Sequence, residues 1–196
     1  MKILFLVLIA TVTLLSEQLK DDLLQIHATL IPKIMMMDYD FEKRLVNDEI
    51  LIGVVYAGAK QKNDALALDR YIQEKYPDGY QKHKIRLEFI AYDVVHLVQK
   101  HTLYYLLPTV KKEIKTALKI AHQQEALSFS YRDEDLKYGV MLSVKVTNKV
   151  KPVINVDALK ETNVTMRPVL LKVADIFFQT SSRLRDIYDQ YSLRFV

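Results

Sequence analysis

A chain of 196 residues has the length of one globular domain and is long enough to bury a single core of ordinary size. Half of its residues are hydrophobic and 27% are charged, which excludes an intrinsically disordered chain. With 0 Cys, disulfides, thiolate nucleophiles and cysteine-based metal sites are excluded, and a net charge of +4 is too small to indicate a nucleic-acid partner.

The first 16 residues have the pattern of a secretory signal. Lys2 supplies a basic start, and the apolar run 3–15 that follows is shorter than the roughly 20 residues of a membrane-spanning helix. Ser16 suits the last position before cleavage, whereas Leu14 is not the small residue expected two positions earlier. We therefore predict a signal peptide over 1–16 and one exported domain over 17–196, with an uncleaved anchor as the alternative.

The exported domain begins with a predicted helix followed by a predicted strand. Apolar residues three and four apart indicate a helix over 17–37, which Pro32 is expected to kink. Met35 to Met37 are expected to pack into the core at its end. The run 50–56 is continuously apolar, which is typical of a central strand covered on both faces.

The segments from residue 57 to residue 138 repeat the alternation of strand and helix. Alternating apolar and charged residues over 84–91 indicate a strand with one wetter face, near an edge of the sheet. In chain order we expect a helix over 63–75, this edge strand, a helical turn within 93–102, a strand over 103–107, a helix opening at 108–109, a strand over 126–131 and a charged loop over 132–138.

The last third predicts a hairpin followed by a long helix. Strands over 140–146 and 153–156 are joined by a polar turn, which favours an antiparallel pair. From Pro168 to Phe178 the apolar spacing predicts an amphipathic helix, which the tail 181–196 either extends or leaves to dock elsewhere. The fold class is therefore α/β, with three layers and a mostly parallel sheet of five or six strands that ends in an antiparallel hairpin.

The junction 53–60 resembles a phosphate-binding loop only superficially. In that loop a lysine directly follows the second glycine and a Ser or Thr comes next, but here Ala59 intervenes after Gly58 and Gln61 follows Lys60. The segment is therefore predicted to be a strand–turn–helix junction. Because α/β sheets bind ligands beyond the carboxyl ends of their strands, we expect a small-molecule crevice here, with Gly58, Lys60 and Asn155 as its residues.

No pattern in the sequence indicates catalysis, a metal or a cofactor, so we expect a protein that is not an enzyme. The histidines form no HxH, HxxxH or HExxH pair and are predicted to be scattered, exposed or partly buried. The acidic run Asp133 to Asp135 lacks the alternating ligands of a calcium loop and is predicted to be solvated. Ser128, Ser130 and Ser143 lie in predicted strands without a His/Asp partner nearby.

The carboxy-terminal part resembles the signature of the YfiR-like (YfiR/HmsC) family. In that family a glycine opens a strand, an apolar strand ending in Asn returns, a DALKETN-type segment follows and an LLKVA helix closes. The corresponding features here are Gly139, the strand 152–155, the segment 157–163 and the helix 170–174. With the strand at 50–56 included, the resemblance covers most of the exported domain.

The resemblance implies a periplasmic α/β regulator without catalysis. Such proteins restrain a membrane-bound diguanylate cyclase by binding its periplasmic sensor part, and so control cyclic di-GMP and biofilm formation. Two departures from the family are the lack of cysteine, which removes redox control of the fold, and Thr165 to Pro168, which replace a frequent serine pair. A periplasmic small-ligand binding protein is the alternative function, and a homodimer stays open.

Overall fold

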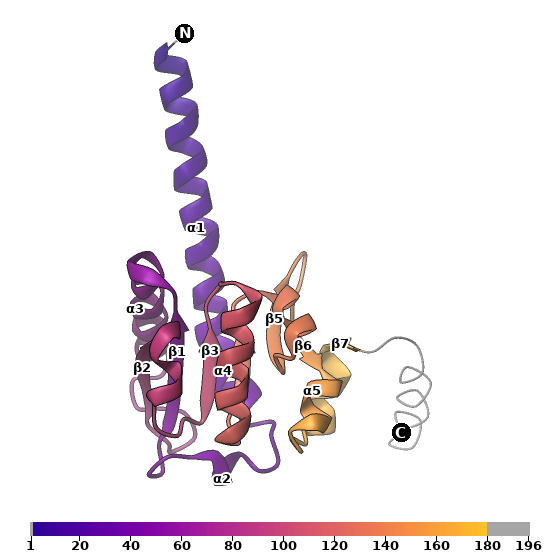
Figure 1. The fold of residues 1–196 in the computed structure, drawn as a ribbon. Coiled ribbons are helices and arrows are strands. Elements are labelled where there is room, and N and C mark those ends of the chain that lie inside the picture. Colours follow the sequence, from indigo (N-terminus) through magenta and orange to yellow (C-terminus); the bar gives the residue numbers. More distant parts are fainter. Residues whose placement is uncertain (1, 180–196) are drawn as a thin grey trace.

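The computed structural model describes residues 2–179, and it has a seven-stranded sheet between two layers of helices (Figure 1). Side chains are described from residue 17 onward. Neighbouring strands follow the order β2-β1-β3-β4-β5-β6-β7. The strands are β1 (Ile50–Tyr56), β2 (Ile85–Ala91), β3 (Leu103–Leu106), β4 (Leu127–Ser130), β5 (Leu142–Val146), β6 (Val150–Asn155) and β7 (Asp175–Phe177).

Helices cover both faces of this sheet, as the sequence predicts. The α-helices are α1 (Lys2–Met35), α2 (Phe41–Arg44), α3 (Gly58–Lys75), α4 (Lys111–Gln123), α5 (Val156–Glu161) and α6 (Pro168–Val173). Two short 3₁₀ helices, η1 (Tyr92–Leu97) and η2 (Asp133–Tyr138), complete the connections. The buried side chains of α1, α3 and α6 share one core with the sheet, and those of η1 and α4 share a second core on the other face.

The strands of the sheet run in two directions. β1 to β5 are parallel to one another, β6 returns antiparallel to β5, and β7 pairs with β6 in parallel. The predicted antiparallel hairpin is therefore confirmed, and its turn lies between Val146 and Val150. As a result, the carboxyl ends of β1 to β5 lie at one edge of the sheet, whereas β6 and β7 end toward the opposite edge.

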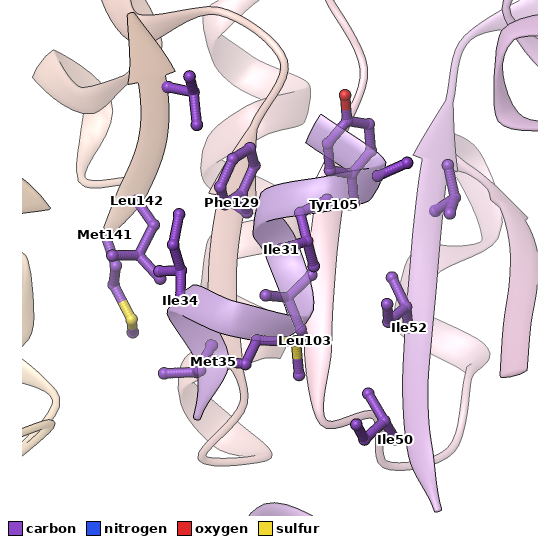
Figure 2. Close-up of a cluster of buried hydrophobic side chains, with 14 of the residues drawn as sticks. Ile31, Ile34, Met35, Ile50, Ile52, Leu103, Tyr105, Phe129, Met141 and Leu142 are labelled. Carbon is purple, nitrogen blue, oxygen red and sulfur yellow. The ribbon is translucent and has the colours of Figure 1, made fainter. Parts of the chain in front are cut away.

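The larger core fixes α1 against the middle of the sheet (Figure 2). Ile31, Ile34 and Met35 are buried in one core with side chains of β1, β3, β4 and β5, and Ile34 lies beside Leu142. Ile52 and Tyr105 come from β1 and β3 and are completely buried. Each fully buried aliphatic side chain of this kind contributes roughly 1.5–3 kcal/mol to the free energy of folding, so the contact holds the carboxyl half of α1 firmly on the sheet.

The predicted roles of β1 and β2 are confirmed by the pairing. Val54 of β1 lies between Phe89 of β2 and Tyr105 of β3, so β1 has a neighbour on both sides. β2 has one neighbour and ends the sheet. Its Arg86 pairs with Glu88 and Glu49 on the exposed side, which is the wetter face that the alternation predicts.

The prediction of one long helix from Pro168 to Phe178 is wrong. The helix α6 ends at Val173, and the backbone of Ala174 is extended (φ −86°, ψ 153°). Asp175 to Phe177 then form β7, which pairs with the outer edge of β6. Backbone hydrogen bonds to that open edge outweigh the helical spacing of the apolar residues, and they give the sheet its seventh strand.

The first helix begins at Lys2, whereas the predicted helix begins at residue 17. α1 continues without a break from Lys2 to Met35, so the segment predicted as a signal peptide forms its amino-terminal half, which extends beyond the sheet (Figure 1). Pro32 lies inside the helix, one turn before its end. In the part of the chain that the structure describes, no helix is long and apolar enough to cross a membrane. The tail 181–196 lies outside the described residues.

Candidate functional site

The loops that follow the adjacent strands β1 and β3 lead to opposite faces of the sheet. β1 leads into α3 on one face of the sheet, and the adjacent β3 leads into α4 on the other face. Such a point, where neighbouring parallel strands send their helices to opposite faces, leaves an opening between the loops and is where open α/β sheets bind ligands.

A crevice of about 510 Å³ lies at this edge, over the carboxyl ends of β1 and β2. We call it the switch-point crevice. Of the residues predicted for a ligand site, Gly58 lines it, whereas Lys60 is exposed on the first turn of α3 and is not in its wall. Its lining consists of Tyr56, Ala57, Gly58, Ala59, Lys62, Ala91, Tyr92, Asp93 and Glu113.

Gly58 leaves bare backbone on the wall of the crevice. Its φ is +77°, a conformation that favours glycine, and a Cβ built on it would meet nothing within 4 Å. No side chain caps the first turn of α3 through the N-cap residue Ala57. A ligand in the crevice can therefore approach the main chain at this turn.

Gln61 connects the two loops that diverge here. Its Oε1 accepts a hydrogen bond from the Ala57 N–H at 2.7 Å, and its Nε2 donates to the Pro108 carbonyl at 2.5 Å. One side chain thus ties the loop after β1 to the loop after β3. This role of Gln61 could not be predicted, because a lone glutamine in the sequence carries no signal for a contact 47 residues away.

The opposite wall is built around Tyr92 and Glu113. The Tyr92 hydroxyl donates to the Leu107 carbonyl at 2.8 Å, and burial raises the pKa of Tyr92, so that the phenol stays protonated. Glu113 accepts a hydrogen bond from the hydroxyl of Thr109, which begins the turn into α4. With Lys62 and Asp93 also in its wall, the crevice presents one ammonium group and two carboxylates.

The loop after β4 is held by a buried carboxylate, so the acidic run is not a fully solvated loop. Asp135 is 1% exposed and accepts from the Ser130 hydroxyl at 2.7 Å and from the Arg132 guanidinium at 3.0 Å. Arg132 also donates to the Thr109 carbonyl. This network joins the loops after β3 and β4.

The prediction that Asn155 belongs to the same crevice is wrong. Asn155 is completely buried at the end of β6, four strand spacings from β1, which is roughly 19 Å. Its Oδ1 accepts from the Ala158 N–H at 3.1 Å and caps α5, and its Nδ2 donates to the Leu136 carbonyl at 2.9 Å. Since both polar atoms are used inside the protein, Asn155 is a structural residue.

Three histidines are more buried than predicted. His27 and His101 are completely buried and His83 is 5% exposed. His101 contacts Glu88 at 3.0 Å through Nε2 and the Gln99 carbonyl at 2.8 Å through Nδ1, while His83 lies 3.0 Å from the Asp48 carbonyl. They therefore act as buried polar groups with their own partners. Among the described residues, no three His, Asp or Glu side chains are grouped to hold a metal ion.

Comparison with known proteins gives structural relatives only. No family model and no curated protein sequence matches the chain. A conserved domain protein from Vibrio cholerae is similar in structure, with a TM-score of 0.54, 17% identity, and coverage of 78% of this chain and 59% of that one. CD0873 from Clostridium difficile, a substrate binding protein in its ligand-free open form, gives 0.51, 15%, 72% and 58%.

A third similar structure is an ABC domain in complex with L-Trp from Streptococcus pneumoniae, with a TM-score of 0.50 and 13% identity, covering 74% of this chain and 62% of that one. This chain covers 59%, 62% and 58% of the three structures, so it spans about three fifths of the length of each. At these identities the likeness shows the fold alone, an α/β architecture with a mostly parallel sheet.

Proposed function

We propose that this protein binds a small molecule in the switch-point crevice and performs no catalysis on it. The observation that carries the proposal is the position of the crevice, between loops that lead to opposite faces of the sheet. Its volume of about 510 Å³ falls within the roughly 300–1,000 Å³ of small-molecule sites. Two of the three similar structures are a substrate binding protein and an ABC domain in complex with L-Trp, which supports the same class.

The wall of the crevice favours a polar ligand. Asp93 and Glu113 accept hydrogen bonds, while Lys62 and the free backbone at Gly58 donate them. The excess of carboxylates over ammonium groups favours hydroxyl or amino substituents on the ligand over phosphates. Gln61 keeps the two loops at a fixed separation, so the site is formed before the ligand arrives.

A thermal-shift screen of the domain against polar metabolites tests this proposal. A ligand that binds the folded state alone raises the melting temperature with its concentration. Ala59→Phe places a ring in the crevice and is expected to abolish the shift. Asn63→Phe, one turn further along α3 and outside the lining, is the matched control and is expected to keep it. A shift that survives Ala59→Phe unchanged would show that the ligand binds elsewhere.

A second candidate function is regulation of an extracytoplasmic sensor, which the resemblance to the YfiR-like family implies. We propose that such a partner, a membrane-bound diguanylate cyclase in the best-known family members, would contact the surface formed by α6 and β7. Val169 and Val173 lie four residues apart on α6 and are 59% and 57% exposed. β7 lies at the end of the sheet, and no described strand pairs with its outer side.

Capture of membrane proteins by the full chain tests the second candidate. Val169→Asp combined with Val173→Asp is expected to abolish recovery of a sensor or cyclase and to change the cellular level of cyclic di-GMP. Leu97→Asp, at a residue that is 72% exposed on the other face, is the control for added surface charge. Recovery of no signalling protein by the unchanged chain, with cyclic di-GMP unaffected on deletion, would contradict this role.

A further inference from the structure

A second pocket lies on the side of the sheet where the amino ends of β1 to β5 are, next to α2 and the carboxyl ends of α4 and α5. It encloses about 180 Å³ and is separate from the switch-point crevice, with which it shares no residue. We call it the basal pocket. Its lining consists of Arg44, His122, Glu125, Ala126, Glu161, Thr162, Asn163 and Val164. The volume is below the roughly 300 Å³ at which drug-sized sites begin, so an occupant must be small.

The floor of the basal pocket is a guanidinium group with one free edge. Arg44 is 7% exposed; its Nε donates to Asp38 Oδ2 at 2.5 Å, and its Nη1 donates to the Glu125 carbonyl. No described residue accepts a hydrogen bond from its Nη2. Asp38, which is 1% exposed, compensates the charge of Arg44 and holds the side chain in place. The pocket therefore has a fixed donor at its base.

The rim of the pocket carries the opposite charge. Glu125 and Glu161 are exposed, and neither side chain takes part in an ion pair with the described residues. Glu125 and Asn163 both have positive φ, 55° and 54°, which turns the chain sharply after α4 and after α5. These ends also present the negative poles of the two helices, so the rim favours a cation.

We propose that the basal pocket binds a small zwitterion, with an oxygen acceptor on Arg44 Nη2 and an ammonium group between Glu125 and Glu161. Both groups are needed. A simple anion would be repelled by the two rim carboxylates, and a simple cation would leave the Nη2 donor of Arg44 without an acceptor. A short amino acid meets both requirements and suits the volume. The proposal is independent of the function proposed for the switch-point crevice, because the two sites lie at opposite edges of the sheet.

Calorimetric titration of the full chain with glycine, β-alanine and γ-aminobutyrate tests the proposal, since these zwitterions differ in the separation of their charges. At least one is expected to bind, while acetate and propylammonium, which carry one charge each, bind at least on the order of tenfold more weakly. Amide resonances of Glu125 and Asn163 are expected to shift on binding, whereas that of Gly58 in the switch-point crevice stays unchanged.

Variants at the rim keep the test independent of folding. Arg44→Lys keeps the positive charge but loses the planar guanidinium that donates to Asp38 and to the Glu125 carbonyl, so it can unfold the domain. Glu125→Gln and Glu161→Gln alter only exposed side chains. Each is expected to weaken zwitterion binding about threefold, and the pair about tenfold. Glu74→Gln, on the exposed surface of α3, is the matched control. Binding that is unchanged in the double variant, or equal for acetate and glycine, or absent for all three zwitterions, would overturn the proposal.

Discussion

The Nδ1 atom of His27 lies 2.7 Å from the hydroxyl oxygen of Tyr105, inside the buried contact between α1 and β3. The rings of Tyr105, Phe129 and Tyr131 meet the imidazole edge-on, at centroid distances of 5.8, 5.2 and 5.7 Å. Nε2 has no hydrogen-bond partner among the described residues. Burial in these surroundings lowers the pKa of His27 from 6.5 to about 3, so the ring is neutral in the folded protein.

This neutral histidine predicts that acid destabilises the domain. The pKa of His27 is lower in the folded state than in the unfolded state, so its contribution to stability is complete above pH 6.5 and is lost as the pH falls toward 3. Between pH 8 and pH 5 the free energy of unfolding should fall by about 2 kcal/mol from this group alone. Urea unfolding at several pH values measures the slope.

Two histidine variants identify the source of that slope. His27→Gln keeps a polar group opposite Tyr105 but cannot titrate, so most of the pH dependence between 8 and 5 should disappear, whatever its effect on stability at pH 8. His96→Gln, at an exposed position in η1, should leave the slope unchanged. The assignment to His27 fails if both variants show the slope of the parent protein.

Two glycines with nearly the same backbone conformation predict very different responses to alanine. Gly58 and Gly79 have φ of +77° and +84°. A Cβ at Gly58 meets open space, so Gly58→Ala should cost about 1 kcal/mol for the left-handed conformation alone. A Cβ at Gly79 clashes with the carbonyl oxygen of His83, so Gly79→Ala should cost about 3 kcal/mol or more. Denaturant unfolding of the two variants gives the comparison, and equal losses would contradict it.

The buried amide of Asn155 predicts a loss of stability without a loss of ligand binding at the switch-point crevice. Asn155→Ala removes the cap of α5 and leaves the Leu136 carbonyl without its donor, which should cost about 2–3 kcal/mol. Asn155→Asp keeps the capping oxygen but buries a charge beside that carbonyl, so it should be less stable than Asn155→Ala. Ligand affinity measured below the melting temperature should be unchanged in both.

The bridge made by Gln61 predicts the opposite result. Gln61→Ala frees the loops after β1 and β3 from each other, and because the side chain is near the surface, the loss of stability should be about 1 kcal/mol. Affinity for a crevice ligand should fall several-fold, because the walls must now be ordered on binding. Asn63→Ala, on the same helix, is the control. Unchanged affinity in Gln61→Ala would show that the crevice does not need the bridge.

Local pattern was sufficient for most of the sheet. The continuous apolar run of β1 and the alternation in β2 each reflect the number of faces and neighbours that a strand has, so its place in the sheet could be inferred. β7 could not be inferred in this way. Its apolar residues fit a helix equally well, and the partner that decided the matter, the open edge of β6, lies about 22 residues earlier in the chain.

The candidate site was predictable only in position. The rule that α/β sheets bind at the carboxyl ends of their strands located Gly58. The same rule misplaced Asn155, because it assumes that every strand ends at the same edge, and β6 runs the other way. The roles of Gln61 and Arg44 depend on side-chain contacts between distant segments, which residue spacing does not encode.

The reversal of direction at the β5–β6 hairpin also separates the two functions proposed for this protein. β7 lies five strand spacings from β1, roughly 24 Å, and α6 contacts β6, so a molecule in the switch-point crevice does not touch the surface formed by α6 and β7. Linkage requires any influence of one on the other to be mutual: a metabolite that loosens the partner must itself be bound more weakly when the partner is present.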